Sequence, residues 1–196
     1  MTTTSDAQAN PAAVGLAAFG LTTVLLSLIN AGVLPAGGES VVLPLALAYG
    51  GLIQIIVGLL EFKVGNTFGM TVFMSYGAFW WWFALLLILG QNGVLDLREA
   101  GSTIGVALLL WGVITAFFWI ASFRLSRTIW SILLLVVITF FLLGLGNLMG
   151  ATWLTRCGGW VGLAAGSLAL YGSFAMVMNA TFGRDVLPLG VKPMLG

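Results

Sequence analysis

The chain has 196 residues, of which 60% are hydrophobic and 7% are charged, and its mean hydropathy is +1.12. This composition excludes a water-soluble domain and predicts an integral membrane protein in contact with a lipid bilayer. The net charge of +1 argues against a nucleic-acid partner, and the absence of histidine excludes haem ligation, His-based metal sites and Ser-His catalysis. We therefore expect no enzyme, no cofactor and no metal.

Six apolar stretches, each about 20 residues long and able to cross the hydrocarbon layer, follow one another along the chain. They lie near 12–34, 41–61, 68–90, 102–123, 129–149 and 158–182. The N-terminal ten residues, MTTTSDAQAN, lack the features of a cleavable signal, so we expect the first stretch to remain as a span. The sequence predicts an all-α, polytopic protein of the cell membrane, with residues 1–196 forming a single transmembrane domain.

The connections between these stretches hold almost every charge, and their signs are unequal on the two sides. An even number of spans places both termini on the same side of the membrane. The cations expected on that side are Lys63, Arg124, Arg127, Arg184 and Lys192, and those expected on the other are Arg98 and Arg156. The positive-inside rule then predicts that both termini are cytoplasmic.

The first span is preceded by Asn-Pro-Ala, the tripeptide of water channels, within NPAAVGLAAFGLTT at 10–23. A water channel needs two such turns that meet at mid-membrane, whereas this chain has one, placed before the first span. We therefore expect Asn10 to cap the helix, with Pro11 at its first position.

Polar side chains enter the first two spans on defined helical faces, and such positions carry most of the functional information in a membrane protein. One face of the first span holds Phe19 together with Thr22, Thr23, Leu26 and Asn30. These polar groups either line a route or bond to neighbouring helices.

A face of the second span that is lined by glycines carries Gln54 and Glu61. For Glu61 a functional role competes with a simple ion pair to Lys63 at the membrane surface.

Two glycines flank Asn66 and Thr67 between the second and third spans, in EFKVGNTFG at 61–69. Amide and hydroxyl donors at a helix N-terminus predict a vestibule for a carboxylate. The competing interpretation is an ordinary turn in which Asn66 or Thr67 caps the next helix.

The later spans contain one more polar stripe and two apolar features. Helix periodicity aligns Val136, Phe140, Leu143 and Asn147, so that Val136 and Asn147 are spaced as Phe19 and Asn30 are. We interpret the glycines at 158, 162 and 166 as packing positions. The mid-span tryptophans at 80–82 are expected to fill contacts between helices or subunits.

Three blocks of the chain resemble the acetate uptake transporter family, the succinate–acetate permeases. They are NPAAVGLAAFGLTT at 10–23, YGGLIQIIVGLLEFKVGNTFGMTVFMSYGAFW at 49–80 and FGRDVLPLG at 182–190, supported by LWGVITAFF at 110–118 and GLGN at 144–147. The first block departs from the family pattern at Ala13 and Val14, where the family has proline and leucine.

The resemblance implies six helices around a narrow path in each protomer, assembly as a homohexamer, and passage of acetate, succinate or other short carboxylates. It implies a hydrophobic constriction formed by Phe19, Tyr76 and Val136, although Leu135 is adjacent and the family more often has leucine there. The polar positions that match the family's route are Thr22, Thr23, Gln54 and Asn66, with Glu61 at its mouth. Asn30 and Asn147 are further candidates for the route.

Three functional hypotheses follow. The first is a channel-like route for acetate, favoured because five of the six acids lie in loops or tails. The second is a proton-coupled symporter in which Glu61 titrates. The third is a membrane scaffold or sensor that transports nothing, which has no need of irregular backbone at membrane depth.

Overall fold

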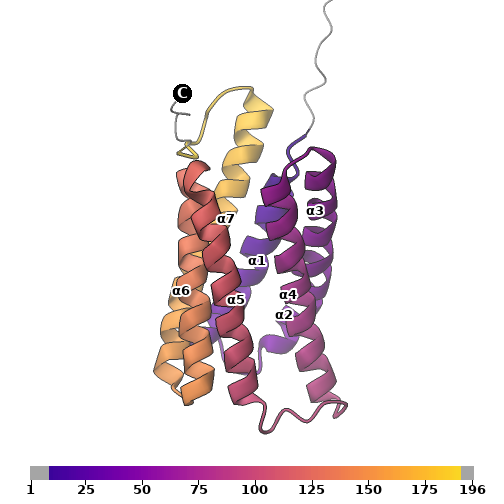
Figure 1. Cartoon of the computed structure of the whole chain (residues 1–196), viewed down its shortest axis with the longest axis vertical. Coiled ribbons are helices and arrows are strands. Elements are labelled where there is room, and N and C mark those ends of the chain that lie inside the picture. Colours follow the sequence, from indigo (N-terminus) through magenta and orange to yellow (C-terminus); the bar gives the residue numbers. More distant parts are fainter. Residues whose placement is uncertain (1–8, 191–196) are drawn as a thin grey trace, which may run out of the picture.

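A computed structural model describes residues 9–190, and every regular element within that range is helical. Nine helical segments follow one another, and Figure 1 shows them as a bundle of long, roughly parallel rods. They are α1 (Ala12–Asn30), α2 (Glu39–Leu45), the π-helix η1 (Ala46–Ile53), α3 (Gln54–Lys63), α4 (Thr67–Gln91), α5 (Gly101–Ala121), the 3₁₀ turn η2 (Ser122–Arg124), α6 (Arg127–Met149) and α7 (Thr152–Phe182).

These segments form six helices that are long and apolar enough to cross a membrane, which confirms the expected class and number of spans. The spans are Ala12–Asn30, Glu39–Lys63, Thr67–Gln91, Gly101–Arg124, Arg127–Met149 and Thr152–Phe182. The first ends four residues earlier than predicted because Gly32 adopts a positive φ of 77° just beyond it. The sixth begins six residues earlier than predicted, with the exposed Arg156 in its second turn.

The start of α1 and the end of α7 lie at the same end of the bundle (Figure 1). We call this the termini end; it also holds the connections 64–66 and 125–126 and the segment 183–190. The connections 31–38, 92–100 and 150–151 lie at the opposite end.

The second span is irregular because Pro44 lies inside it. Proline has no backbone N–H and cannot complete the hydrogen-bond ladder of α2, and wider π-helical turns follow from Ala46. Gln54 is the first residue after these turns, at the start of α3.

α1 lies inside the bundle, and its closest neighbour is α7 (Figure 1). A Cβ added at Gly20 would lie 2.8 Å from the backbone oxygen of Gly166, and one added at Gly159 would collide with the backbone of Ala31. A Cβ added at Gly162 would lie 2.5 Å from Oγ of Ser27, and one added at Gly158 would lie 2.9 Å from the side chain of Leu143. The predicted glycine series therefore packs helices together.

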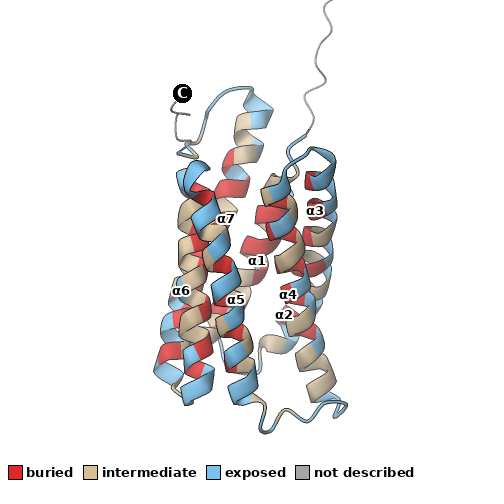
Figure 2. Cartoon of the chain, viewed as in Figure 1, coloured by how far each residue is buried: buried red, intermediate tan, exposed pale blue. Residues whose placement is uncertain are grey.

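Buried residues follow the inner faces of the helices and exposed apolar residues cover the outer faces (Figure 2). This inverted polarity is expected for a surface that meets lipid instead of water.

The three mid-span tryptophans have different surroundings. Trp80 is 3% exposed and packs against Gly50, whereas the Nε1 of Trp81 donates to the carbonyl oxygen of Leu47 at 3.0 Å. The ring of Trp82 packs 5.8 Å from that of Phe79. Trp80 and Trp81 therefore join α4 to the π-helical span, as the hypothesis of helix–helix contacts requires.

Candidate functional site

Three cavities follow one another between the helices, from the termini end to the opposite end. The termini-end cavity has a volume of about 250 Å³, the middle cavity about 50 Å³ and the opposite-end cavity about 240 Å³. The first two share Phe19 and Tyr76 as walls, and the last two share Leu26, Asn30, Phe79 and Leu143. The arrangement is a row of three cavities with the smallest at the centre, and we call this row the path.

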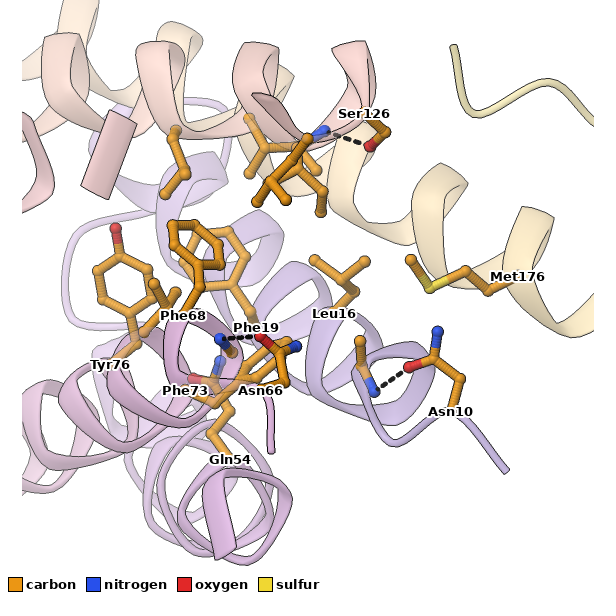
Figure 3. Close-up of a pocket in the computed structure, with 17 residues that line it drawn as sticks. Asn10, Leu16, Phe19, Gln54, Asn66, Phe68, Phe73, Tyr76, Ser126 and Met176 are labelled. Carbon is orange, nitrogen blue, oxygen red and sulfur yellow. Dashed lines mark hydrogen bonds between the residues drawn. The ribbon is translucent and has the colours of Figure 1, made fainter. Parts of the chain in front are cut away.

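Polar groups of the termini-end cavity come mainly from uncharged side chains: Asn10, Gln54, Asn66, Tyr76 and Ser126 (Figure 3). The sequence places three of these groups at helix starts. The carboxamide oxygen of Asn10 accepts from the N–H of Ala12 at 3.0 Å, but α1 begins at Ala12 with Pro11 in the capping position, one residue later than predicted. The hydroxyl of Ser126 accepts from the N–H of Ile129 at 3.2 Å and caps α6.

Asn66 has two partners, which explains the turn between α3 and α4. Its side-chain oxygen accepts from the N–H of Gly69 at 3.1 Å, so Asn66 caps α4. Its Nδ2 donates to Oε2 of Glu61 at 2.7 Å. The capping interpretation is therefore confirmed, and the residue also lines the cavity.

Glu61 is 1% exposed and lies behind Asn66, outside the walls of the three cavities. Its partner is the amide of Asn66, and within residues 9–190 it forms no ion pair with Lys63. The hypothesis of a surface ion pair is therefore wrong. The Oε1 atom has no hydrogen-bond partner in the described part of the chain.

Gln54 is completely buried and reaches the same cavity from α3. Its Nε2 donates to the carbonyl oxygen of Gly15 at 3.5 Å, at the limit of a hydrogen bond. Its Oε1 finds no partner among residues 9–190. A buried amide of this kind is available to a ligand in the cavity.

Three apolar side chains bring the path to its narrow centre. The rings of Phe19 and Tyr76 lie 5.5 Å apart, centroid to centroid, and Val136 forms part of the wall just beyond them. Val136 is 5% exposed, whereas the neighbouring Leu135 lines none of the three cavities. The structure thus brings together the three residues that the resemblance selects.

Two features of this centre were not found from the sequence. The hydroxyl of Tyr76 donates to Oγ1 of Thr115 at 3.2 Å, and Thr115 in turn donates to the carbonyl oxygen of Trp111 at 2.8 Å. The sequence signal for this contact was that Thr115 is a single threonine within the apolar run 104–121. A second aromatic pair, Phe79 and Phe140, meets edge to face at 5.1 Å on the other side of the middle cavity.

The two threonines of α1 have different roles. Thr22 is fully buried against Gly50, and its hydroxyl donates to the carbonyl oxygen of Ala18 at 2.9 Å. It lines none of the three cavities. Thr23 lines the middle cavity, and its Oγ1 lacks a hydrogen-bond partner within the described residues. Of this pair, only Thr23 can meet a ligand on the path.

The opposite-end cavity contains both further candidates, Asn30 and Asn147, together with Glu39 and Thr155. Nδ2 of Asn147 donates to the carbonyl oxygen of Leu143 at 2.9 Å, which leaves its other amide groups available. Glu39 lies between the first two predicted spans; in the structure it opens α2 and lines the cavity.

The chemistry of this path is that of a conduit for a small polar or amphipathic solute. No lysine or arginine lines any of the three cavities, and residues 9–190 contain no cluster of potential metal ligands. Amides and hydroxyls alternate with aromatic and aliphatic walls. Such groups bind a solute weakly and repeatedly, which favours passage over retention.

The chain matches known proteins over most of its length. It is 41% identical over 182 residues to the succinate-acetate/proton symporter SatP of Escherichia coli K12, covering 93% of this chain and 95% of that protein. It is 33% identical to acetate permease A of Emericella nidulans, covering 94% and 67% of the two chains.

A solved structure described as the bacterial acetate channel SatP superposes with a TM-score of 0.89 at 40% identity, covering 93% of this chain and 99% of that one. With the six spans, these matches make the chain a multi-pass protein of the cell membrane. The profile of the GPR1/FUN34/yaaH family matches residues 1–189. The chain belongs to the GPR1/FUN34/yaaH family.

Proposed function

We propose that this protein is a channel-like passage for acetate and for succinate or other short carboxylates. The observation that carries the proposal is the row of three cavities with a centre of about 50 Å³. Names of relatives support it, since they describe succinate-acetate transport, acetate permeation and an acetate channel.

Acetate suits this path because one end of the molecule is apolar and the other is a carboxylate. The amides of Gln54 and Asn66 are proposed to receive the carboxylate at the termini end, and those of Asn30 and Asn147 at the opposite end. Between them the hydroxyl of Thr23 provides an intermediate donor. Neutral donors hold an anion less tightly than a cation would, so the solute can leave as well as enter.

Phe19, Tyr76 and Val136 are proposed to form the constriction that limits the size of the solute. Their walls are apolar, so the methyl group passes easily and the carboxylate crosses at a cost. The aromatic pair Phe79 and Phe140 extends this constriction toward the opposite end.

The test is uptake of labelled acetate into liposomes that contain the purified protein, with and without an imposed pH gradient. We expect rapid equilibration without accumulation. The Phe19→Ala, Tyr76→Ala double variant should admit larger monocarboxylates that the wild type excludes. Flux no greater than in empty liposomes would overturn the assignment in favour of a scaffold.

Proton-coupled symport is a second candidate, favoured by the buried Glu61 and its unpartnered Oε1. It predicts accumulation above equilibrium only when the pH gradient is present. It also predicts that Glu61→Gln abolishes the pH dependence. If Glu61→Gln transports with an unchanged pH profile, Glu61 is not the titrating group.

The cytoplasmic location of both termini is part of the proposal and is supported by the distribution of cations. Of the described cations, Lys63, Arg124, Arg127 and Arg184 lie at the termini end. Lys192, the fifth cation predicted on this side, lies outside the described residues. In a Cys157→Ser background, a membrane-impermeant maleimide should label Glu99→Cys in intact cells and should label Lys63→Cys only after lysis. The reverse pattern would invert the topology.

We also propose that residues 1–196 act as one transmembrane domain and that protomers assemble as a homohexamer, each with its own path. The resemblance supports the hexamer, and the apolar outer faces of the helices are compatible with contacts to lipid or to other protomers. Native mass spectrometry of the purified protein measures the number of subunits directly.

A further inference from the structure

The two end cavities are similar in volume, but an ionisable carboxylate lines only one of them. Glu39 lies in the wall of the opposite-end cavity, whereas the described polar groups of the termini-end cavity are amides, hydroxyls and backbone. We propose that Glu39 is a specificity-determining residue that disfavours dicarboxylates at the opposite-end mouth relative to monocarboxylates. This inference rests on the proposed function.

The position of the Glu39 carboxylate is restrained by its own loop. Its Oε2 accepts a hydrogen bond from the backbone N–H of Gly37 at 2.7 Å. The side chain is partly exposed, as is that of Asn30 on α1, and Asn147 on the far wall is exposed. The cavity therefore opens here, and a solute entering it passes a fixed negative charge.

Among the described residues, no cation forms a salt bridge with Glu39. Within the described residues, the salt bridge that forms joins Arg98 to Asp96, in the connection between α4 and α5. Arg156 lies over the α1–α2 connection, with Nε 3.5 Å from the position of a Cβ added at Gly32, and lies outside the cavity wall. Besides the paired Asp96, this end carries Glu99, which lines none of the three cavities.

A fixed negative charge discriminates between solutes according to their net charge. At a distance of about 8 Å, and with a dielectric between that of water and of a protein surface, each additional negative charge on a solute lowers its local concentration roughly two- to tenfold. A monocarboxylate experiences this once and a dicarboxylate twice. The amides of Asn30 and Asn147 can still receive one carboxylate, so acetate remains acceptable at this mouth.

The experiment compares Glu39→Gln with Glu99→Gln in proteoliposomes. Both variants remove one negative charge at the same end of the protein, but only the first removes it from the wall. Uptake of labelled acetate is inhibited by succinate or by monomethyl succinate, at a pH where succinate is a dianion and its ester a monoanion. Each inhibitor is present at equal concentration on both sides of the membrane, so that protein orientation does not affect the result.

We expect succinate to become roughly two- to tenfold more potent relative to monomethyl succinate in Glu39→Gln, and to be unchanged in Glu99→Gln. High ionic strength should reduce the difference between Glu39→Gln and the wild type. Acetate uptake by Glu39→Gln itself provides the evidence that the variant is folded.

Three results would overturn the inference while leaving acetate transport intact. They are an unchanged potency ratio in Glu39→Gln, an equal change in Glu99→Gln, and an equal gain for the dianion and the monoanion. Absence of acetate uptake in the wild type would instead overturn the proposed function, and the inference with it.

Discussion

The two end cavities of the path are alike in volume, at about 250 and 240 Å³, and both carry carboxamides. They differ in the position of the nearest acid. At the termini end Glu61 lies behind the wall, with the amide of Asn66 between it and the cavity, whereas at the opposite end Glu39 is part of the wall. The comparison teaches that the position of a glutamate decides its effect: behind the wall it leaves the cavity lined by neutral groups, and in the wall it adds a carboxylate to the lining.

The two glutamates differ in how much surrounding structure each needs. Glu61 is almost fully buried and depends on a single side-chain donor, so its environment must be built by the surrounding helices. Glu39 remains in partial contact with solvent and needs only a backbone N–H to restrain it. The buried acid is therefore coupled to the stability of the fold, whereas the partly exposed one is the acid that we propose acts on entering solutes.

The largest effect should come from closing the centre that separates the two cavities. An indole is larger than the cavity of about 50 Å³ into which Val136→Trp would place it. We expect acetate uptake to fall roughly fivefold to a hundredfold, because an added barrier of about 1–3 kcal/mol corresponds to that range. Ile138→Trp, on the exposed face of the same helix, is the control and should retain uptake.

The next effect is on the free energy of unfolding and arises at the termini-end cavity. Asn66→Ala removes the cap of α4, at about 1 kcal/mol, and deprives the buried Glu61 of its donor, at about 1–3 kcal/mol more. Asn10→Ala removes only an exposed side-chain hydrogen bond just before α1, at about 1 kcal/mol or less. Equilibrium unfolding in detergent measures both. Equal losses for the two variants would mean that the bond to Glu61 contributes nothing.

A smaller effect should follow from weakening the hydrogen bond that holds Tyr76 in the constriction. Thr115→Val removes the acceptor of the Tyr76 hydroxyl, at about 1–2 kcal/mol, and frees the ring that lies against Phe19. We expect selectivity for acetate over larger monocarboxylates to weaken while acetate uptake persists. Thr71→Val is the matched control because its hydroxyl bonds to the carbonyl of Thr67 in its own helix; it should leave selectivity as it is.

The smallest effect concerns a charge at the opposite end that lies outside the cavity wall. The Arg98 guanidinium lowers the pKa of the Asp96 carboxyl, mainly through its side-chain hydrogen bond, so any stability from the pair is present above the ordinary pKa of aspartate and is lost as the pH falls. Both side chains are highly exposed, and solvent screens their attraction. Melting temperatures of wild type and Arg98→Ala should therefore agree at neutral pH. A clearly lower melting temperature of Arg98→Ala would show that this ion pair stabilises the connection 92–100.

The sequence by itself determined the class of the protein, the six spans and the helical faces that carry polar groups. Hydropathy and a period of 3.6 residues are local properties, so Phe19, Thr23 and Asn30 on one helix, and Val136 and Asn147 on another, could be assigned to stripes. The resemblance then selected Tyr76 as their partner.

Only the tertiary structure decided which member of a stripe meets the path. Thr22 and Thr23 are adjacent on α1, and one lies against Gly50 while the other lines the middle cavity. Periodicity cannot separate them, because the neighbours of a helix are set by packing between segments far apart in the chain. The same reason applies to Glu61 and Glu39. Hydropathy places one acid at the end of a span and the other beside a loop, but the packing of α3 against α4 determines that the first is covered, and the arrangement of helices around the opposite-end cavity places the second in its wall.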